Sequence, residues 1–321
     1  MLAVQVQRTG GPEVLEVVDL PEPAPGPGEI LIAQEAVGLN FIDTYHRGGL
    51  YPMKLPAVLG TEGAGVVEAV GEGVTRFKVG DRVGYAGGLG AYARKRTYPA
   101  DRAVKLPEGV STRLAAASLL KGMTAEFLLR RCYAVQAGDA ILVHAAAGGV
   151  GQILCQWGKA LRARVIGTVG SEAKVEIARG VGCEEVILYR EEDVAARVRE
   201  ITGGEGVRAA YDGVGADTFE ASLNSLGRRG VLVTYGNASG PAPAFAPLKL
   251  MRGSLFVTRP TLFDYIATAP ELDESAGALF AVLQSGAVKI DIGQEFALAD
   301  AKAAHEALES RATTGSTLLI P

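Results

Sequence analysis

The sequence predicts an α/β protein with a doubly wound, six-stranded parallel sheet (a Rossmann fold) and a second domain that is a β-rich barrel. From residue 140 to residue 258, short apolar runs alternate with helix-like segments, which is the chain order of a parallel sheet with crossover helices. Before residue 111, short apolar runs separated by proline and glycine are typical of a small barrel. The length of 321 residues fits about two domains.

The first third of the chain carries strand patterns that are broken by turn residues. We expect strands at residues 14–18, 29–32 and 63–71, and a turn at residues 79–83 that enters a further strand. Near residue 111 the pattern becomes rich in alanine and leucine, and Ser111 is placed to cap a helix over residues 111–120.

From residue 140 onward the two patterns alternate regularly. The predicted strands are 140–143, 164–168, 185–188, 209–212, 231–234 and 255–258, and the predicted helices are 149–161, 171–179, 193–201 and 217–226. Helices at 275–284 and 299–309 and a strand at 316–320 follow. We expect this last segment to return to the first domain, so that residues 1–121 and 261–321 form the β-rich domain and residues 122–260 the Rossmann domain.

Composition excludes several classes of protein. Hydrophobic residues make up 48% of the chain, which is enough for real cores, and the net charge of -4 argues against a dedicated nucleic-acid binder. No apolar run is long enough to cross a membrane, and no secretory signal pattern is visible. The three cysteines are widely scattered, so neither a disulfide framework nor a zinc ribbon is expected. A reduced, cytoplasmic location is therefore predicted.

The strongest motif is a glycine-rich turn between a predicted strand and a predicted helix. It has the form Ala146-x-Gly148-x-x-Gly151, close to the dinucleotide fingerprint but with alanine at its first position. Gly148 would let the backbone approach a pyrophosphate, and Gly151 would allow close packing of helix on strand. Amides at the helix start would face the phosphates. This motif predicts a dinucleotide site.

The next predicted strand favours NADPH over NADH. NAD-binding folds usually carry an acid at its end, which bonds the ribose 2′-hydroxyl and would repel a 2′-phosphate. Here no carboxylate appears until Glu172, whereas Ser171 can donate a hydrogen bond and Lys174 adds positive charge. Tyr189 ends the following strand, where it could cover the adenosine. Glu172 opposes this interpretation unless it points outward from the first turn of its helix.

A second motif resembles the signature of the medium-chain dehydrogenase/reductase superfamily. It is Gly60-Thr61-Glu62-x-x-Gly65. In that superfamily a zinc-ligating histidine usually follows the first glycine, and Thr61 stands there in this chain. The clustered cysteines of the superfamily's structural zinc lobe are also missing, so no metal is expected. We interpret Glu62 as a buried structural carboxylate.

Further residues narrow the resemblance and extend it over essentially the whole chain. Residues 138–159 with the glycine-rich turn, 40–45, 49–52, 120–124, 189–192, 235–237, 257–260 and 309–313 are similar to the quinone oxidoreductase pattern. The chain resembles the bacterial, zeta-crystallin-like NADPH:quinone oxidoreductases, which are zinc-free. The resemblance implies that the β-rich domain is GroES-like, that the protein is a homodimer, and that a quinone is reduced in a cleft between the domains.

The resemblance also implies a set of cofactor contacts. Gly148, Gly149 and Val150 would hold the pyrophosphate, and Gly170, Ser171, Lys174 and Tyr189 the 2′-phosphate and adenosine. The nicotinamide end would be contacted by Asn40, Tyr45, Tyr235, Gly236, Asn237, Val257, Thr258 and Arg259.

Quinone reduction needs placement of the substrate over the nicotinamide rather than a metal or a strong base. Tyr51 and Thr124 are the predicted substrate contacts, and Tyr45 would orient the nicotinamide. The histidines are not expected to be catalytic: we interpret His144 as a satisfied core residue, His46 as solvent-facing and His305 as part of a polar helix.

Three other functions stay open. The same scaffold reduces the activated C=C bond of alkenals or enones, and there a well-placed tyrosine would matter more because the product needs a proton on carbon. The chain could instead be an NADPH-responsive binding protein, although its acidic charge argues against RNA. It could also bind NADPH as a sensor without turnover.

Overall fold

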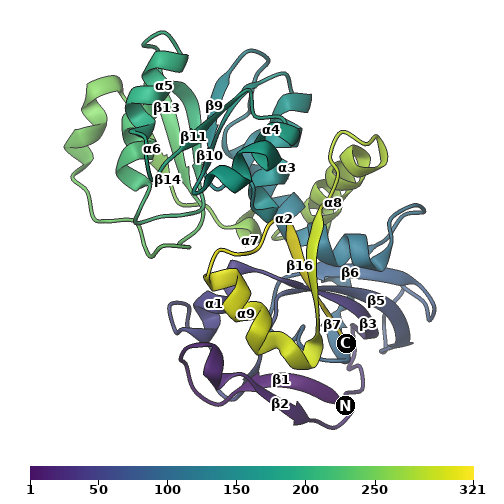
Figure 1. Ribbon diagram of the computed structural model, residues 1–321. Helices are drawn as coiled ribbons and strands as arrows, with labels where there is room; N and C mark the ends of the chain where they lie inside the picture. Colours follow the sequence, from purple (N-terminus) through teal and green to yellow (C-terminus); the bar gives the residue numbers. More distant parts are fainter. The chain divides into compact units, whose positions relative to one another are not determined.

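The computed structural model describes residues 1–321, and the chain forms two compact units (Figure 1). The β-rich unit comprises Met1–Met123, Ile266–Gln284 and Ile290–Pro321. The α/β unit comprises Thr124–Tyr265 and Ser285–Lys289. The short stretch at 285–289 belongs to the α/β unit, which the predicted boundaries at 121 and 260 do not include.

The α/β unit holds the predicted six-stranded parallel sheet. Its order is β11-β10-β9-β12-β13-β14, and every neighbouring pair is parallel. The strands are β9 (Ala140–Val143), β10 (Arg164–Val169), β11 (Glu185–Leu188), β12 (Val207–Asp212), β13 (Leu226–Thr234) and β14 (Phe256–Thr258). Chain order reverses between β9 and β12, which is the position where ligands bind in doubly wound sheets. The predicted fold class is confirmed.

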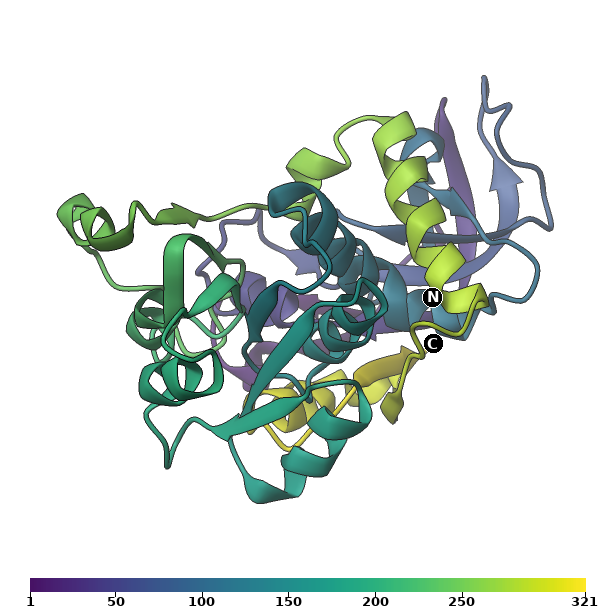
Figure 2. The ribbon, with the colours of Figure 1, turned by 90° about the horizontal axis from the view of Figure 1, so that it is seen from above.

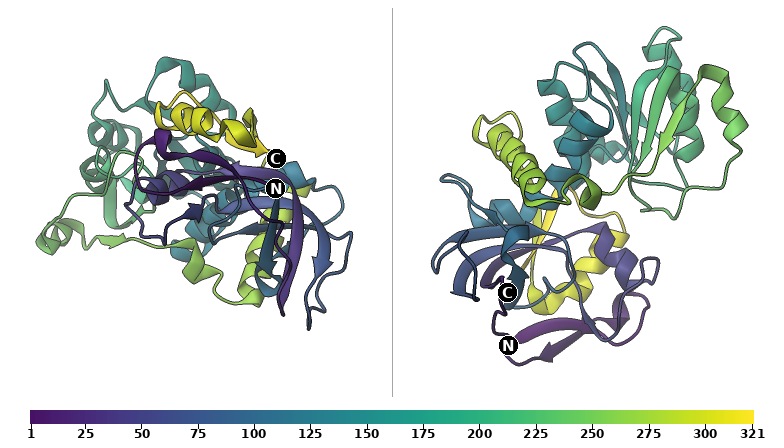
Figure 3. Two further views of the ribbon diagram at one scale, coloured as in Figure 1. Left: turned by 90° about the horizontal axis from the view of Figure 1, so that it is seen from below. Right: turned by 180° about the vertical axis from the view of Figure 1, so that it is seen from behind.

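The helices of this unit follow the strands as expected, with one local difference. The predicted ones are α3 (Gly149–Ala160), α4 (Val175–Gly180), α5 (Val194–Ile201) and α6 (Phe219–Ser225), drawn in teal to green in Figure 3. A short helix that was not predicted, α7 (Leu262–Tyr265), follows them. The helix predicted at 171–179 begins as a 3₁₀ turn, Glu172–Lys174, before α4. Ser171 is extended at its N-cap, so the chain turns tightly where β10 ends.

The β-rich unit contains two sheets. One has the order β2-β1-β4, and the other the order β15-β16-β3-β5-β6-β8 with β7 paired to β3. The strands are β1 (Leu2–Val6), β2 (Glu16–Asp19), β3 (Glu29–Leu39), β4 (Ala57–Val58), β5 (Glu62–Val70), β6 (Arg82–Ala86), β7 (Lys95–Pro99), β8 (Val104–Lys105), β15 (Ile292–Ala297) and β16 (Ser316–Ile320). The strand predicted at 316–320 is β16, and its antiparallel pairing with β3 brings the end of the chain into this sheet.

Four helices complete the fold. They are α1 (Phe41–Arg47), α2 (Thr112–Phe127), α8 (Ala269–Gln284) and α9 (Ala301–Glu309). Ser111 Oγ accepts the Leu114 N–H at 3.1 Å, so the predicted cap is present, and α2 continues seven residues beyond the predicted end. The boundary between the two units falls inside α2. No helix is long and apolar enough to cross a membrane.

Sequence patterns missed two helices and five strands, which are α1, α7, β1, β4, β7, β8 and β15. The segment of α1 mixes aromatic and polar residues without a clean apolar stripe, so hydrophobic periodicity does not indicate a helix there. The helix begins at Asn40, whose backbone N–H donates to the Asp43 carboxylate at 2.9 Å. That local bond, rather than hydrophobic periodicity, fixes its start.

Two helical glycines predict opposite effects on stability. Gly277 is exposed on α8 with open space around it, so Gly277→Ala should stabilise the protein by about 0.5–1 kcal/mol through helix propensity. Gly122 on α2 leaves no such space, because a Cβ would collide with the buried Leu279 side chain. Gly122→Ala should therefore lower the melting temperature. Thermal unfolding of both variants checks the contrast, and a gain for both would contradict it.

Candidate functional site

The loop between β9 and α3 is shaped to present backbone amides. Ala145 has a φ of 52°, and the Gly148 N–H donates to its carbonyl at 2.9 Å. Gly148 is the extended N-cap of α3, so the amides of the first helical turn have no acceptor within the helix. At Gly151 a Cβ would press against the Ala145 carbonyl oxygen. The loop therefore requires glycine at position 151, which is the last glycine of the fingerprint.

The carboxyl end of β10 lies beside the end of β11. The Tyr189 hydroxyl covers Gly170, where a Cβ would stand 3.1 Å from that oxygen. Lys174 is half-buried, and its N–H closes the turn onto the Ser171 carbonyl at 3.0 Å. Glu172 is exposed. This edge thus brings together the four residues predicted for the 2′-phosphate and adenosine.

The ends of β13 and β14 carry the other predicted contacts of this unit. Arg259 Nη1 donates to the Thr234 carbonyl at 3.1 Å. The Asn237 amide satisfies both of its polar atoms when its oxygen faces Arg259, where it accepts from Nη2 at 3.1 Å. Gly236 packs so closely on Gly213 that a side chain would strike its carbonyl oxygen. The remaining predicted contacts here are Tyr235, Val257 and Thr258, all half-buried. Thr124 also belongs to the α/β unit, where it is buried.

The β-rich unit holds the predicted residues near α1. The Tyr45 and Tyr51 rings meet edge to face with centroids 5.4 Å apart, and His46 lies 5.6 Å from Tyr51. His46 was expected to face solvent; it is instead half-buried, and that burial lowers its pKa. Its Nδ1 is enclosed with no hydrogen-bond partner. Asn40 is buried at the start of α1.

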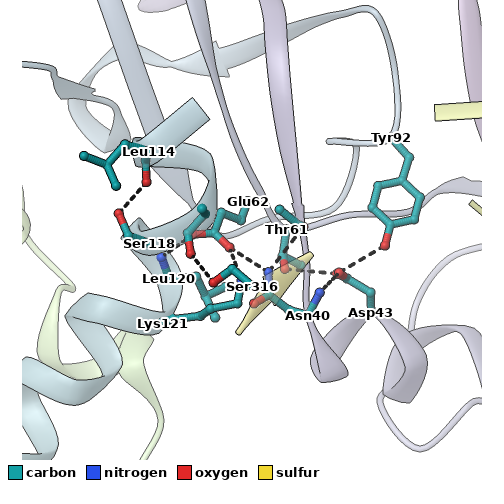
Figure 4. Close-up of polar contacts among 12 residues, drawn as sticks. Asn40, Asp43, Thr61, Glu62, Tyr92, Leu114, Ser118, Leu120, Lys121 and Ser316 are labelled. Atoms are coloured by element: carbon teal, nitrogen blue, oxygen red, sulfur yellow. Dashed lines mark hydrogen bonds and ion pairs between the residues drawn. The ribbon is translucent and has the colours of Figure 1, made fainter. Parts of the chain in front are cut away.

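Asn40 joins a buried cluster that is centred on Glu62 (Figure 4). Glu62 is fully buried, and its Oε2 accepts from Asn40 Nδ2 at 2.8 Å and from Lys121 Nζ at 3.1 Å. Its Oε1 accepts from the Leu120 N–H of α2 at 2.7 Å. Every carboxylate oxygen is therefore partnered, and the ion pair with Lys121 balances the charge. Glu62 is the buried structural carboxylate that the sequence predicted.

A second buried carboxylate, Asp43, ends a chain of hydrogen bonds. Arg47 Nη1 lies 2.9 Å from His305 Nδ1, His305 Nε2 lies 2.9 Å from the Tyr92 hydroxyl, and that hydroxyl lies 3.2 Å from Asp43 Oδ2. An arginine can only donate, so Nδ1 of His305 carries no proton and Nε2 does. His305 then donates to Tyr92, and Tyr92 donates to Asp43.

Burial in this hydrogen-bonded cluster shifts the pKa values of His305 and Asp43. His305 was expected on a polar helix, but it is fully buried, and burial together with Arg47 lowers its pKa to about 3. Asp43 also accepts from the Asn40 N–H and from Thr61 Oγ1 at 3.1 Å, yet burial raises its pKa to about 7. Sequence patterns could not have shown this cluster, because Arg47 and His305 lie 258 positions apart.

The fold, the glycine-rich edge of the parallel sheet and the buried polar clusters of the β-rich unit together define a medium-chain dehydrogenase/reductase. Residues 149–276 match the family described as zinc-binding dehydrogenase, and residues 26–108 match the alcohol dehydrogenase GroES-like domain. A quinone oxidoreductase of Salmonella typhimurium is 52% identical over 99% of both chains. The chain belongs to the quinone oxidoreductase family.

Solved structures agree with this assignment over the full length. The quinone oxidoreductase of Escherichia coli in complex with NADPH is 50% identical, covers 100% of both chains and has a TM-score of 0.98. Among the sequence relatives, a 2-haloacrylate reductase of a Burkholderia species is 42% identical over 100% of this chain and 99% of its own. The GroES-like and Rossmann domains predicted from the sequence are both confirmed.

The zinc in the description of the matched family does not fit the residues present here. A catalytic zinc ion needs three protein ligands that converge on one position. No group of three or more His, Cys, Asp or Glu side chains is placed to hold a metal ion. Thr61, where the superfamily usually has a histidine ligand, donates to Asp43 instead. No step of the chemistry is therefore assigned to zinc.

The raised pKa of Asp43 predicts a pH-dependent stability. The folded pKa of about 7 lies above 3.8, the ordinary value of an aspartate side chain. The stability that protonated Asp43 contributes is therefore fully present below the unfolded pKa and is lost as pH rises through 7. Lys121 and the Arg47–His305–Tyr92 chain are the charged and titratable groups around it. Relative to Asp43→Asn, the wild type should lose about 2 kcal/mol between pH 5 and pH 8.

Urea unfolding of both proteins across that range measures the difference. Asp101→Asn, at an exposed carboxylate of the same unit, is the control and should follow the wild type. Parallel curves for the wild type and Asp43→Asn would contradict the raised pKa.

Proposed function

We propose that this chain is an NADPH:quinone oxidoreductase. The observation that carries the cofactor choice is the carboxyl end of β10, where Ser171 and Lys174 stand and the nearest carboxylate, Glu172, is exposed. A carboxylate that bonds a ribose 2′-hydroxyl is absent from this position, and a cation suits a 2′-phosphate. The NADPH-bound relative supports the same cofactor.

The proposed cofactor contacts follow the carboxyl edge of the parallel sheet, except for Asn40 and Tyr45, which belong to the β-rich unit. The amides of Gly148, Gly149 and Val150 face the pyrophosphate, and the positive end of the α3 dipole favours it. Gly170, Ser171, Lys174 and Tyr189 hold the 2′-phosphate and adenosine. The nicotinamide end is assigned to Asn40, Tyr45, Tyr235, Gly236, Asn237, Val257, Thr258 and Arg259.

Bound NADPH would supply the reducing electrons. The protein's own work is placement: Tyr51 and Thr124 position the quinone, and Tyr45 orients the nicotinamide. A reduced quinone takes its protons on oxygen, where water can supply them, so no side chain is assigned as a strong acid.

A second activity is favoured by one relative. The 2-haloacrylate reductase matches this chain over its full length, and its name describes reduction of a conjugated acid. Reduction of an activated C=C bond places a proton on carbon and therefore needs a positioned donor. We assign that role to the hydroxyls of Tyr45 and Tyr51, whose rings are in contact.

We also propose that the protein is a homodimer that pairs through β14. This strand is one of the two edge strands of the parallel sheet, of which β11 is the other. Figure 2 draws this strand and the 3₁₀ segment before it in light green. Phe256 on β14 and Leu248 and Met251 on that segment are 58%, 73% and 75% exposed. An unpaired edge flanked by large apolar side chains is suited to pairing with a second copy across a twofold axis.

Steady-state kinetics tests the proposed reaction. NADPH oxidation is followed with 1,4-benzoquinone, with 9,10-phenanthrenequinone and with an alkenal, and each assay is repeated with NADH. We expect turnover with NADPH and the quinones and little with NADH. A large preference for the alkenal would replace quinone by enone reduction. Tight NADPH binding without turnover on any acceptor would favour a sensor.

Lys174→Ala tests the 2′-phosphate site. Loss of a charge-assisted contact should raise KM for NADPH about tenfold or more and leave KM for NADH nearly unchanged. Arg179→Ala removes a cation at the far end of α4, where it pairs with Glu176, and serves as the matched control. An equal effect of Lys174→Ala on both cofactors would contradict the assignment.

Phe256→Asp tests the dimer. A carboxylate at this edge should shift the protein toward monomer in sedimentation experiments, because burying it at the interface is costly. Val79→Asp replaces another exposed apolar residue, in the β-rich unit, and should leave the mass of the sedimenting species unchanged. A wild-type protein that sediments as a monomer would remove the proposal.

A further inference from the structure

His144 occupies a central buried position that the proposed reaction does not use. It follows β9 directly and precedes the glycine-rich loop, and its side chain is fully buried. Its Nδ1 lies 2.9 Å from Thr168 Oγ1 of β10. Its Nε2 lies 2.9 Å from Ser222 Oγ of α6. One imidazole thus joins three elements of the α/β unit.

The neighbouring carboxylate determines which ring nitrogen carries the proton. Ser222 Oγ lies 2.7 Å from Asp212 Oδ2 and 2.9 Å from the Thr218 carbonyl, and both are acceptors. The serine therefore directs its single proton to them and accepts from His144 Nε2–H. Nδ1 is then bare and accepts from the Thr168 hydroxyl. Burial lowers the pKa of His144, which keeps the ring neutral.

Asp212 carries the connection to the next loop. Its Oδ1 accepts the Val214 N–H at 2.9 Å and the Gly215 N–H at 3.0 Å, just beyond the end of β12. Thr218 Oγ1 lies within 2.8 Å of both carboxylate oxygens. The Asp212 carboxylate thus fixes the loop at residues 213–215.

Backbone bonds extend the connection to β13. The Asp212 carbonyl accepts the Tyr235 N–H at 2.8 Å, and the Ala216 N–H donates to the Gly240 carbonyl at 3.0 Å. On the other side, the Ala146 N–H of the glycine-rich loop donates to the Thr168 carbonyl at 3.0 Å. One continuous set of hydrogen bonds therefore links the carboxyl ends of β10, β9, β12 and β13.

We propose that His144 is a positioning residue that sets the spacing between the two halves of the dinucleotide site. The proposal rests on the proposed function, because it takes NADPH to lie along this edge. The adenosine half would engage the end of β10 and the nicotinamide half the end of β13. A rigid ring held at both nitrogens keeps the intervening loops in register, so both halves bind at once without reorganisation.

Ligand fragments separate this role from a merely structural one. His144→Phe keeps a planar aromatic ring, although a larger one, and removes both hydrogen bonds. Dissociation constants are measured calorimetrically for NADPH, for 2′,5′-ADP and for reduced nicotinamide mononucleotide. We expect the NADPH constant to rise about tenfold, which is about 1.4 kcal/mol of lost coupling. The constant for 2′,5′-ADP should stay within about twofold, and kcat at saturating NADPH should be nearly unchanged.

Val198→Ala provides the matched control. Val198 is a fully buried residue of α5 outside this set of hydrogen bonds. Its truncation should lower the melting temperature and leave the ratio of NADPH to 2′,5′-ADP affinity unchanged. Ser222→Ala removes the acceptor of Nε2–H together with one donor to Asp212, leaves the His144–Thr168 bond, and should repeat the His144→Phe pattern more weakly. It serves as the test if the phenylalanine variant does not fold.

Two results would overturn the positioning role: NADPH affinity that is unchanged in folded His144→Phe, or fragments that weaken as much as the whole dinucleotide. If the wild-type protein binds neither NADPH nor 2′,5′-ADP, the proposed function itself fails. Nitrogen NMR supplies an independent check. The ring-nitrogen signals of one histidine with a bare Nδ1 and a protonated Nε2 should differ between the wild type and Ser222→Ala.

Discussion

A charge buried away from water must be fully partnered, and this requirement organises both units. Asp212 meets it with backbone amides and hydroxyls at the carboxyl edge of the parallel sheet. Glu62 meets it with Lys121, the Asn40 amide and an amide of α2. The partners of Glu62 come from segments far apart in the chain, whereas those of Asp212 come from the loop after β12 and from α6, all within ten residues of it. Satisfying one carboxylate therefore fixes several loops at once.

The polar cluster of the β-rich unit stands where the wider superfamily usually has a metal ligand. Thr61 donates to Asp43, whose other donors are the backbone of Asn40 and the Tyr92 hydroxyl. A neutral hydroxyl at this position changes the electrostatics, because no cation balances Asp43 directly and burial raises its pKa. The cluster thus holds α1 in place by hydrogen bonds rather than by coordination.

The α/β unit was predictable in detail because its signals are local. The strands at 140–143 and 185–188 were predicted to the residue, since buried parallel strands are short apolar runs between turn residues. The glycine-rich turn was recognisable from the spacing of its glycines. The β-rich unit was less readable, because strands such as β3 are irregular and its sheet closes through the last strand of the chain. No periodicity reports a partner 258 residues away, so the buried state of His305 was missed.

The histidines limit the chemistry that the protein can perform. His144 and His305 are buried and neutral, and both ring nitrogens of each are committed to hydrogen bonds. Neither can deliver a proton to a substrate without breaking a buried bond. His46 alone has a ring nitrogen without a partner, and it lies beside Tyr51. Quinone reduction needs no proton from these histidines, because its product accepts protons on oxygen from water. Reduction of a C=C bond would instead require the Tyr45–Tyr51–His46 group to supply the proton, so the relative rates on the two substrate classes report directly on what that aromatic group does.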